Sequence, residues 1–222
     1  MNAVYTYCCI DGNEADEFTV MMAKLSVGTV RRFTGMKTIL YTNVHSFDSV
    51  EFDDIIYCDF FTWNWDRRYW NIPKFITYAK QESPFIHIDI DLHILPNFIV
   101  DSDADIICEK VRFISPNEQV CRHCTNPEFA ACSGIMGTST IKGLDYFKSL
   151  YEKSILECKS GIHDDVSFYD LVSIEECHTY NHAIENGMSI CYPGFWTYCH
   201  YTSVDKKERY GIAVERAIKN LL

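Results

Sequence analysis

Two carboxylates, Asp89 and Asp91, stand inside the otherwise apolar run of residues 85–94. In an extended chain, alternate side chains point to the same side, so this spacing predicts that both acids share one face with His87 and His93. Burying carboxylates is costly unless a partner replaces their lost hydration. A hard divalent cation is the simplest such partner, because Mg²⁺ or Mn²⁺ binds carboxylates together with substrate phosphate oxygens. We therefore expect a metal site here. The alternative is an edge strand whose solvated face carries the two carboxylates without a functional role.

A second pattern stands near the C-terminus. His200 and Lys206 are six residues apart in the run His-Tyr-Thr-Ser-Val-Asp-Lys. The alternative for His200 is an ordinary surface histidine beside aromatic residues.

These two patterns together resemble the GT-A-fold glycosyltransferases that use nucleotide-sugar donors, and in particular the retaining family that contains glycogenin and the lipopolysaccharide galactosyltransferases. An apolar strand ending in D-x-D is the metal-binding signature of these enzymes. The C-terminal run is similar to their H-x-x-G-x-x-K motif, with Ser203 in place of the glycine. The resemblance implies that Asp89, Asp91 and His200 hold Mn²⁺ or Mg²⁺, with Asp91 the more direct ligand. It also implies that Lys206 holds the donor diphosphate.

Further pieces of the sequence match the same family in the same order along the chain. The resemblance implies that the strand and turn near the N-terminus bind the nucleotide, and that the run Cys-Ser-Gly-Ile-Met lines the sugar site. The residues expected to bind the nucleotide sugar are Tyr5, Thr6, Asn43, Lys74, Asp89, Gly134 and Lys206. Each also has an ordinary structural reading, since tyrosine and threonine are common in strands and lysine is common on solvated helices.

Asp164 and Asp165 stand at the start of a segment with helical spacing. Carboxylates are favoured at helix N-termini for capping alone, which is the structural alternative. The resemblance places both acids facing the sugar. In an inverting enzyme Asp165 would be the general base that deprotonates the acceptor hydroxyl. In a retaining enzyme Asp164 would bind sugar hydroxyls and Asp165 would lie beneath the anomeric carbon; the C-terminal motif favours a retaining reaction.

The elements that must position these residues alternate between strand and helix. Strands are expected at residues 3–9, 37–42, 54–59, 85–94, 104–108, 130–137 and 188–192, and helices at 16–33, 73–81, 140–158, 164–177 and 212–222. Such alternation predicts an α/β fold with a mainly parallel sheet flanked by helices, whose ligands bind at the carboxyl ends of the strands. With the resemblance, we expect one GT-A (Rossmann-like) glycosyltransferase domain over residues 1–222.

Length and composition exclude several other classes of protein. The chain has 222 residues, a formal net charge of −11 and 11 cysteines. The acidic balance argues against a protein that coats nucleic acid or anionic membrane through bulk electrostatics. No apolar run reaches the roughly 20 residues of a membrane span, and the N-terminus does not have an export signal. We therefore expect a cytoplasmic protein, or one in the host cytoplasm if it is viral, with reduced thiols.

The partners implied by the resemblance are a nucleotide-sugar donor and a hydroxyl acceptor, either a glycan or a modified base in phage DNA. The negative charge is not what DNA binding predicts, although Arg67 and Arg68 stand among tryptophans. A nucleotidyltransferase is the first alternative, because it also uses paired carboxylates and Mg²⁺. A non-catalytic module held by zinc at Cys121 and Cys124 is the second.

Overall fold

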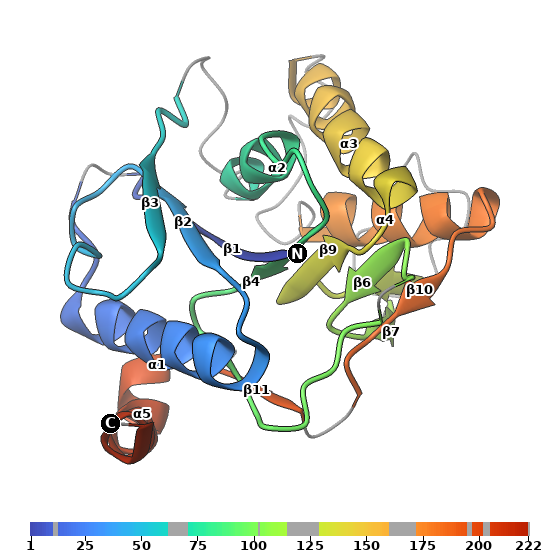
Figure 1. Ribbon diagram of the computed structural model, residues 1–222. Coiled ribbons are helices and arrows are strands. Elements are labelled where there is room, and N and C mark those ends of the chain that lie inside the picture. Colours follow the sequence, from blue (N-terminus) through green and yellow to red (C-terminus); the bar gives the residue numbers. More distant parts are fainter. Residues whose placement is uncertain are drawn as a thin grey trace. The chain divides into compact units, whose positions relative to one another are not determined.

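The computed structural model describes residues 1–10, 13–61, 71–101, 103–114, 129–159, 172–194, 197–201 and 205–221 (Figure 1). The chain divides into two compact units. The first unit comprises Met1–Asp59, His87–Ile99 and Pro193–Leu222, and the second comprises Phe60–Ile86 and Val100–Tyr192. A single domain over residues 1–222 stays a prediction.

The first unit is built on three parallel strands. These are β1 (Asn2–Tyr7), β2 (Thr38–Thr42) and β3 (Asp54–Tyr57), and they pair in the order β1-β2-β3. All five residues of β2 are buried, as expected for a central parallel strand with both faces covered. Because the strands are parallel, their carboxyl ends meet at one edge, and the residues that follow Tyr7, Thr42 and Tyr57 lie along that edge.

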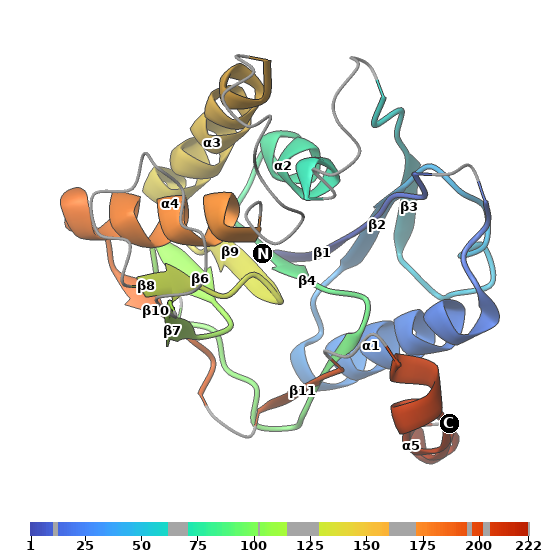
Figure 2. The ribbon, with the colours of Figure 1, turned by 180° about the vertical axis from the view of Figure 1, so that it is seen from behind.

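Helix α1 (Glu17–Thr34) packs against this unit through an apolar face that includes Phe18, Met22 and Leu25. Asp16 begins the helix as its N-cap by accepting a hydrogen bond from the backbone N–H of Thr19 at 2.7 Å. Gly35 ends it in the left-handed conformation at φ 65°, which glycine adopts without strain. The C-terminal helix α5 (Lys206–Leu221) packs against α1, and both views show the two helices next to each other (Figures 1 and 2).

The acidic run is not one continuous strand, and this corrects the expectation for residues 85–94. Strand β4 (Phe85–Ile88) ends before Asp89, and strand β5 (Leu92–Ile94) begins after Asp91. A tight turn separates them, in which the backbone N–H of Leu92 donates to the carbonyl oxygen of Asp89 at 3.0 Å. Strand β5 then pairs in antiparallel fashion with β11 (Tyr198–His200), away from the main sheet.

In its described residues, the second unit combines three helices with short strands. Helix α2 (Ile72–Ala79) packs on α3 (Ile141–Lys159), and α4 (Val172–Glu185) packs on β8 (Phe129–Ala131), as Figure 2 shows. Strand β6 (Ile106–Cys108) pairs in parallel with β10 (Ile190–Cys191) and antiparallel with β9 (Ile135–Thr138). Strand β7 (Val111–Phe113) forms a separate antiparallel pair with β8.

The strand order of the main sheet is β10-β6-β9-β4-β1-β2-β3. This confirms the predicted α/β fold with a mixed, mainly parallel sheet flanked by helices. Among the described helices, none combines the length and the apolar character that a membrane crossing requires.

Several element boundaries differ from the sequence expectations. The strand expected at residues 130–137 is split into β8 and β9 by a turn at Ser133 and Gly134. The terminal helix begins at Lys206, six residues before the expected start. The sequence did not reveal these six residues because the first turn of the helix is polar and has no apolar periodicity. Of the helix expected at 164–177, residues 164–171 lie outside the described part of the chain, and α4 continues to Glu185.

Candidate metal centre

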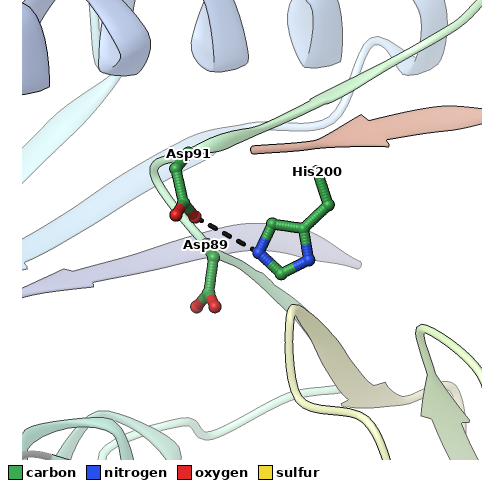
Figure 3. Close-up of side chains that lie close together, drawn as sticks. All are labelled: Asp89, Asp91 and His200. Carbon is green, nitrogen blue, oxygen red and sulfur yellow. Dashed lines mark ion pairs between the residues drawn. The ribbon is translucent and has the colours of Figure 1, made fainter. Parts of the chain in front are cut away.

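Three side chains from the first unit converge at the end of β4 (Figure 3). They are Asp89 and Asp91, from either side of the turn, and His200, from the last position of β11. Each offers one ligand atom, and these atoms all lie within 4.8 Å of one another. The Nε2 atom of His200 lies 3.4 Å from Oδ1 of Asp91. Among the described residues, this is the group of histidine, cysteine and acidic side chains that could hold a metal ion.

The turn after β4 is what brings the two carboxylates together. A continuous strand would have placed Asp89 and Asp91 on one face of a sheet. Instead, the chain reverses between them in the turn, and this brings their carboxylates close together. Their side chains are 21% and 15% exposed, and that of His200 is 15% exposed. The group therefore lies partly shielded from water, where electrostatic attraction to a cation is stronger than in bulk solvent, and still open to a ligand.

The donor set fits a hard divalent cation. Two carboxylate oxygens and one imidazole nitrogen suit Mg²⁺ or Mn²⁺, and three protein ligands leave positions for water or phosphate oxygens. Two carboxylates this close repel each other, and a cation between them would remove that cost. Asp89, Asp91 and His200 are thus the residues that would hold the ion.

A buried histidine lies next to the metal centre, beside Asp89. His87, on β4, has no solvent exposure, and its Nδ1 atom lies 3.7 Å from Oδ1 of Asp89. Its other ring nitrogen, Nε2, lies 3.1 Å from the hydroxyl oxygen of Thr6 on β1. The sequence predicted Thr6 near the nucleotide. In the structure its hydroxyl contacts His87, which in turn lies next to Asp89.

His200 is held by contacts on both sides of its backbone. Strand β11 pairs with β5 so that His200 lies opposite Leu92, and Cys199 lies opposite His93. The ring of Tyr201 stacks on His93 with centroids 5.4 Å apart, and it contacts Tyr210 of α5 at 4.9 Å. Burial lowers the pKa of His93, so this stack has a neutral imidazole. His93 thus supports the strand that carries His200, although the alternation of the sequence placed it beside the acids.

Two other residues expected at the nucleotide, Tyr5 and Asn43, also belong to the first unit. Tyr5 is fully buried, its hydroxyl accepts a hydrogen bond from Ser26 at 3.2 Å, and burial raises its pKa. Its side chain is part of the core between β1 and α1. Asn43 follows β2 and makes two hydrogen bonds to the backbone of Cys9, of 2.8 and 2.9 Å. Asn43 therefore ties together the carboxyl ends of β1 and β2, the edge where ligands of parallel sheets bind.

Lys74 and Gly134 belong to the second unit. Lys74 is buried in the first turn of α2, and its ammonium interacts electrostatically with the buried Glu176 of α4. Gly134 is buried in the turn between β8 and β9, next to Ser133. The backbone N–H of Ser133 donates to Glu176 at 3.0 Å, so the carboxylate holds the turn in place.

The remaining expectations fall on parts of the chain that the structure does not describe. Asp164 and Asp165 lie outside the described residues, as do Cys121 and Cys124, Arg67 and Arg68, and Ser203. Lys206 is the first residue of α5, and only its backbone position is described. The catalytic acids, the diphosphate-binding lysine and the zinc alternative therefore stay predictions.

Among the cysteines whose side chains the structure describes, none forms a disulfide. Burial raises the pKa of Cys8, Cys108 and Cys132 to about 12, so these thiols are protonated at neutral pH. Burial also raises the pKa of Cys199, the residue before His200. None of these thiols belongs to the group of described side chains that could hold a metal ion.

Comparison with known proteins gives structural matches only. No family model matches the chain, and neither does any curated protein. Among solved structures, the galactosyltransferase LgtC in complex with donor and acceptor sugar analogs matches with a TM-score of 0.54 at 10% identity, covering 99% of this chain and 96% of that one. The inositol-1-phosphate CTP transferase from T. maritima matches with a TM-score of 0.50 at 13% identity, covering 98% and 96%. These similarities confirm the GT-A-like fold.

Proposed function

We propose that this protein is a metal-dependent glycosyltransferase, which transfers a sugar from a nucleotide-sugar donor to a hydroxyl acceptor. The observation that carries the proposal is the convergence of Asp89, Asp91 and His200 at the end of β4. The GT-A-like fold supports it, since a solved structure of this fold is a galactosyltransferase with bound sugar analogs.

The metal centre accounts for the leaving group of such a reaction. When a nucleotide sugar loses its sugar, negative charge builds up on the diphosphate, and a bound Mn²⁺ or Mg²⁺ supplies the charge that stabilises it. In this chain Asp89, Asp91 and His200 would hold the ion, and Lys206 would add a point charge toward the phosphates. Asn43 and Cys9 lie at the carboxyl edge of β1 and β2, where the nucleoside would bind.

The finer parts of the proposal come from the sequence. Asp164 and Asp165 would face the sugar and the acceptor hydroxyl, and the C-terminal motif favours a retaining reaction. Gly134, in the turn held by Glu176, would line the sugar site together with Lys74. The acceptor would be a glycan or a modified base in phage DNA.

A nucleotidyltransferase is the second candidate, because the match to the CTP transferase of T. maritima covers almost the whole chain at a similar TM-score. Both reactions use a metal-bound nucleotide, but they break different bonds. A glycosyltransferase releases a nucleoside diphosphate, whereas a nucleotidyltransferase joins a nucleoside triphosphate to a phosphorylated acceptor and releases pyrophosphate. The released product therefore separates the two functions.

The first experiment measures thermal stability with nucleoside diphosphates and nucleotide sugars, each with Mn²⁺ and with EDTA. A ligand at 100 times its Kd stabilises the folded state by roughly 2.7 kcal/mol, which a thermal shift resolves. We expect one nucleotide to stabilise the chain only with Mn²⁺, and this effect to be lost in Asp91→Asn. The matched control is Asp145→Asn, which removes an exposed carboxylate on α3 and keeps the effect.

The second experiment identifies the product released from the stabilising donor with sugar and hydroxyl acceptors. A nucleoside diphosphate supports glycosyl transfer. Pyrophosphate release from a nucleoside triphosphate and a sugar phosphate would replace the proposal with the nucleotidyltransferase. If no nucleoside diphosphate or nucleotide sugar stabilises the chain with Mn²⁺, the proposed glycosyltransferase function is wrong.

A further inference from the structure

Thr6, His87 and Asp89 form a chain of contacts from the half-buried end of β1 to the metal centre. The hydroxyl oxygen of Thr6 lies 3.1 Å from Nε2 of His87, and Nδ1 of His87 lies 3.7 Å from Oδ1 of Asp89. His87 has no solvent exposure, while the side chain of Asp89 is 21% exposed. The contact to Asp89 is thus made from the protein side, opposite the side open to solvent.

The two contacts together select one tautomer of the imidazole. A carboxylate oxygen repels the lone pair of an unprotonated Nδ1 but attracts an N–H, so Nδ1 carries the proton. Nε2 is then an acceptor, and the hydroxyl of Thr6 is the donor that it faces. The carboxylate of Asp89, which can only accept, therefore favours this tautomer, and the hydroxyl of Thr6 holds the ring by donating to Nε2.

We propose that His87, set by Thr6, is a positioning residue that orients the Asp89 carboxylate for metal binding. This inference rests on the metal-dependent function proposed above. Oδ1 of Asp89 lies 3.7 Å from Nδ1, which is an electrostatic contact longer than a hydrogen bond; attraction to an N–H there favours one orientation of the carboxylate and leaves its other lone pairs for the cation. Partners of this kind behind metal ligands change metal affinity by about 10 to 100-fold when they are removed.

The competing explanation is that His87 only fills the core, with Thr6 as its hydrogen-bonding partner. That role predicts a loss of folding stability on substitution but no specific effect on metal affinity. Two amide substitutions separate the explanations, because an asparagine amide places its nitrogen near the position of Nδ1, whereas a glutamine amide reaches the position of Nε2. His87→Asn keeps a donor toward Asp89, and His87→Gln keeps only the group facing Thr6.

The test is direct titration of the full-length protein with Mn²⁺, followed by isothermal calorimetry or by the EPR signal of free Mn²⁺, with no nucleotide present. We expect His87→Gln to weaken Mn²⁺ binding by about 10 to 100-fold, and His87→Asn to stay within about threefold of the unaltered chain. Thr6→Val, which keeps the shape but removes the hydroxyl, should weaken binding, and Thr6→Ser should restore it. His182→Phe, which removes an imidazole on α4 in the second unit, is the control and should leave affinity unchanged.

Urea unfolding of each variant accompanies the titration, so that a loss of folding is recognised. If His87→Gln does not fold, the comparison of Thr6→Val with Thr6→Ser decides the question. Equal Mn²⁺ affinity in all variants overturns the inference and leaves the proposed function intact, and so does equal weakening by Asn and Gln. Failure of the unaltered chain to bind Mn²⁺ overturns the proposed metal-dependent function as well.

Discussion

The backbone N–H of Tyr201 donates a hydrogen bond of 3.0 Å to the carbonyl oxygen of Asp91. This bond joins the residue that follows His200 to the second acid of the turn. The side chains of His200 and Asp91 approach within 3.4 Å on the same two segments. The backbone bond therefore fixes the distance between two candidate metal ligands that are more than one hundred residues apart in sequence.

The first prediction concerns the aromatic ring that holds this junction. Tyr201→Ala removes the ring between His93 and Tyr210, so β11 loses its packing and His200 its fixed position. We expect the free energy of unfolding to fall by about 1 to 2 kcal/mol, since the ring is only partly buried. We also expect Mn²⁺ affinity to fall by about tenfold, as for other groups that orient metal ligands. Calorimetric titration and urea unfolding measure the two effects.

Tyr201→Phe is the control for that substitution. Burial raises the pKa of Tyr201 to about 12, so its hydroxyl is uncharged at neutral pH and the ring supplies the contact. The phenylalanine variant should therefore bind Mn²⁺ as the unaltered chain does. Normal Mn²⁺ affinity in Tyr201→Ala would show that β5 pairing alone positions His200.

The sequence predicted which side chains would meet at this site, but not the backbone that brings them together. The D-x-D spacing and the C-terminal motif placed Asp89, Asp91 and His200 in one group, and the structure brings them within 4.8 Å. Strand alternation suggested the right neighbours for the wrong reason, because a strand and a tight turn both bring residues i and i+2 close together. Periodicity alone does not distinguish these two cases over three residues.

Contacts between distant segments explain what sequence reasoning missed. His87 was noticed for its alternation with the acids, but its partner Thr6 is 81 residues away. The support of the Ser133 turn by Glu176 likewise joins residues that are 43 apart. From sequence alone, a carboxylate in a helix is expected to be solvated. Glu176 is buried because α4 packs on β8. The α/β alternation was readable because each element carries its own periodicity.

The second prediction concerns Gly137 on β9. A Cβ atom added there would lie 2.2 Å from the carbonyl oxygen of Phe85 and 2.7 Å from Cα of Ile86, both of them backbone atoms. We expect Gly137→Ala to lower the free energy of unfolding by about 1 to 3 kcal/mol, because the strands must move apart. Gly211→Ala in α5 is the matched control, since a Cβ there meets open space. It should stabilise the helix by about 0.5 to 1 kcal/mol, and equal effects in urea unfolding would contradict the prediction.

The third prediction concerns the buried carboxylate of Glu176. Burial raises its pKa, although Arg112, at 3.3 Å, and the N–H of Ser133 oppose that shift. A pKa that is higher in the folded state means that stability is lost as the pH rises through it. Glu176→Gln keeps an acceptor for Ser133 and removes the titration, so we expect the variant to gain stability relative to the unaltered chain as pH increases from about 4 to 7. Urea unfolding across this range measures the difference.

Glu176→Ala is the companion to that variant. It removes the acceptor as well, which leaves the N–H of Ser133 without its partner and costs about 1 to 3 kcal/mol at every pH. A difference between the Gln variant and the unaltered chain that does not change with pH would show that Arg112 compensates the burial completely.

The fourth prediction has the opposite dependence on pH and concerns Asp53, which precedes β3. Its Oδ2 atom accepts hydrogen bonds of 2.8 Å from the backbone N–H and from the hydroxyl of Thr38, and Arg31 lies 3.7 Å from its other oxygen. These contacts, of which the hydrogen bond from the backbone N–H has the largest effect, hold the pKa of Asp53 below its ordinary value.

The stabilisation by the Asp53 carboxylate is therefore present above the ordinary aspartate pKa of about 3.9, and it is lost as the pH falls through the lower pKa of the folded state. We expect Asp53→Asn to cost about 1 kcal/mol at neutral pH and almost nothing near pH 2, measured by urea unfolding. Asp145→Asn on α3 should show no such change, and a constant cost of Asp53→Asn at all pH values would mean that shape rather than charge links β3 to β2.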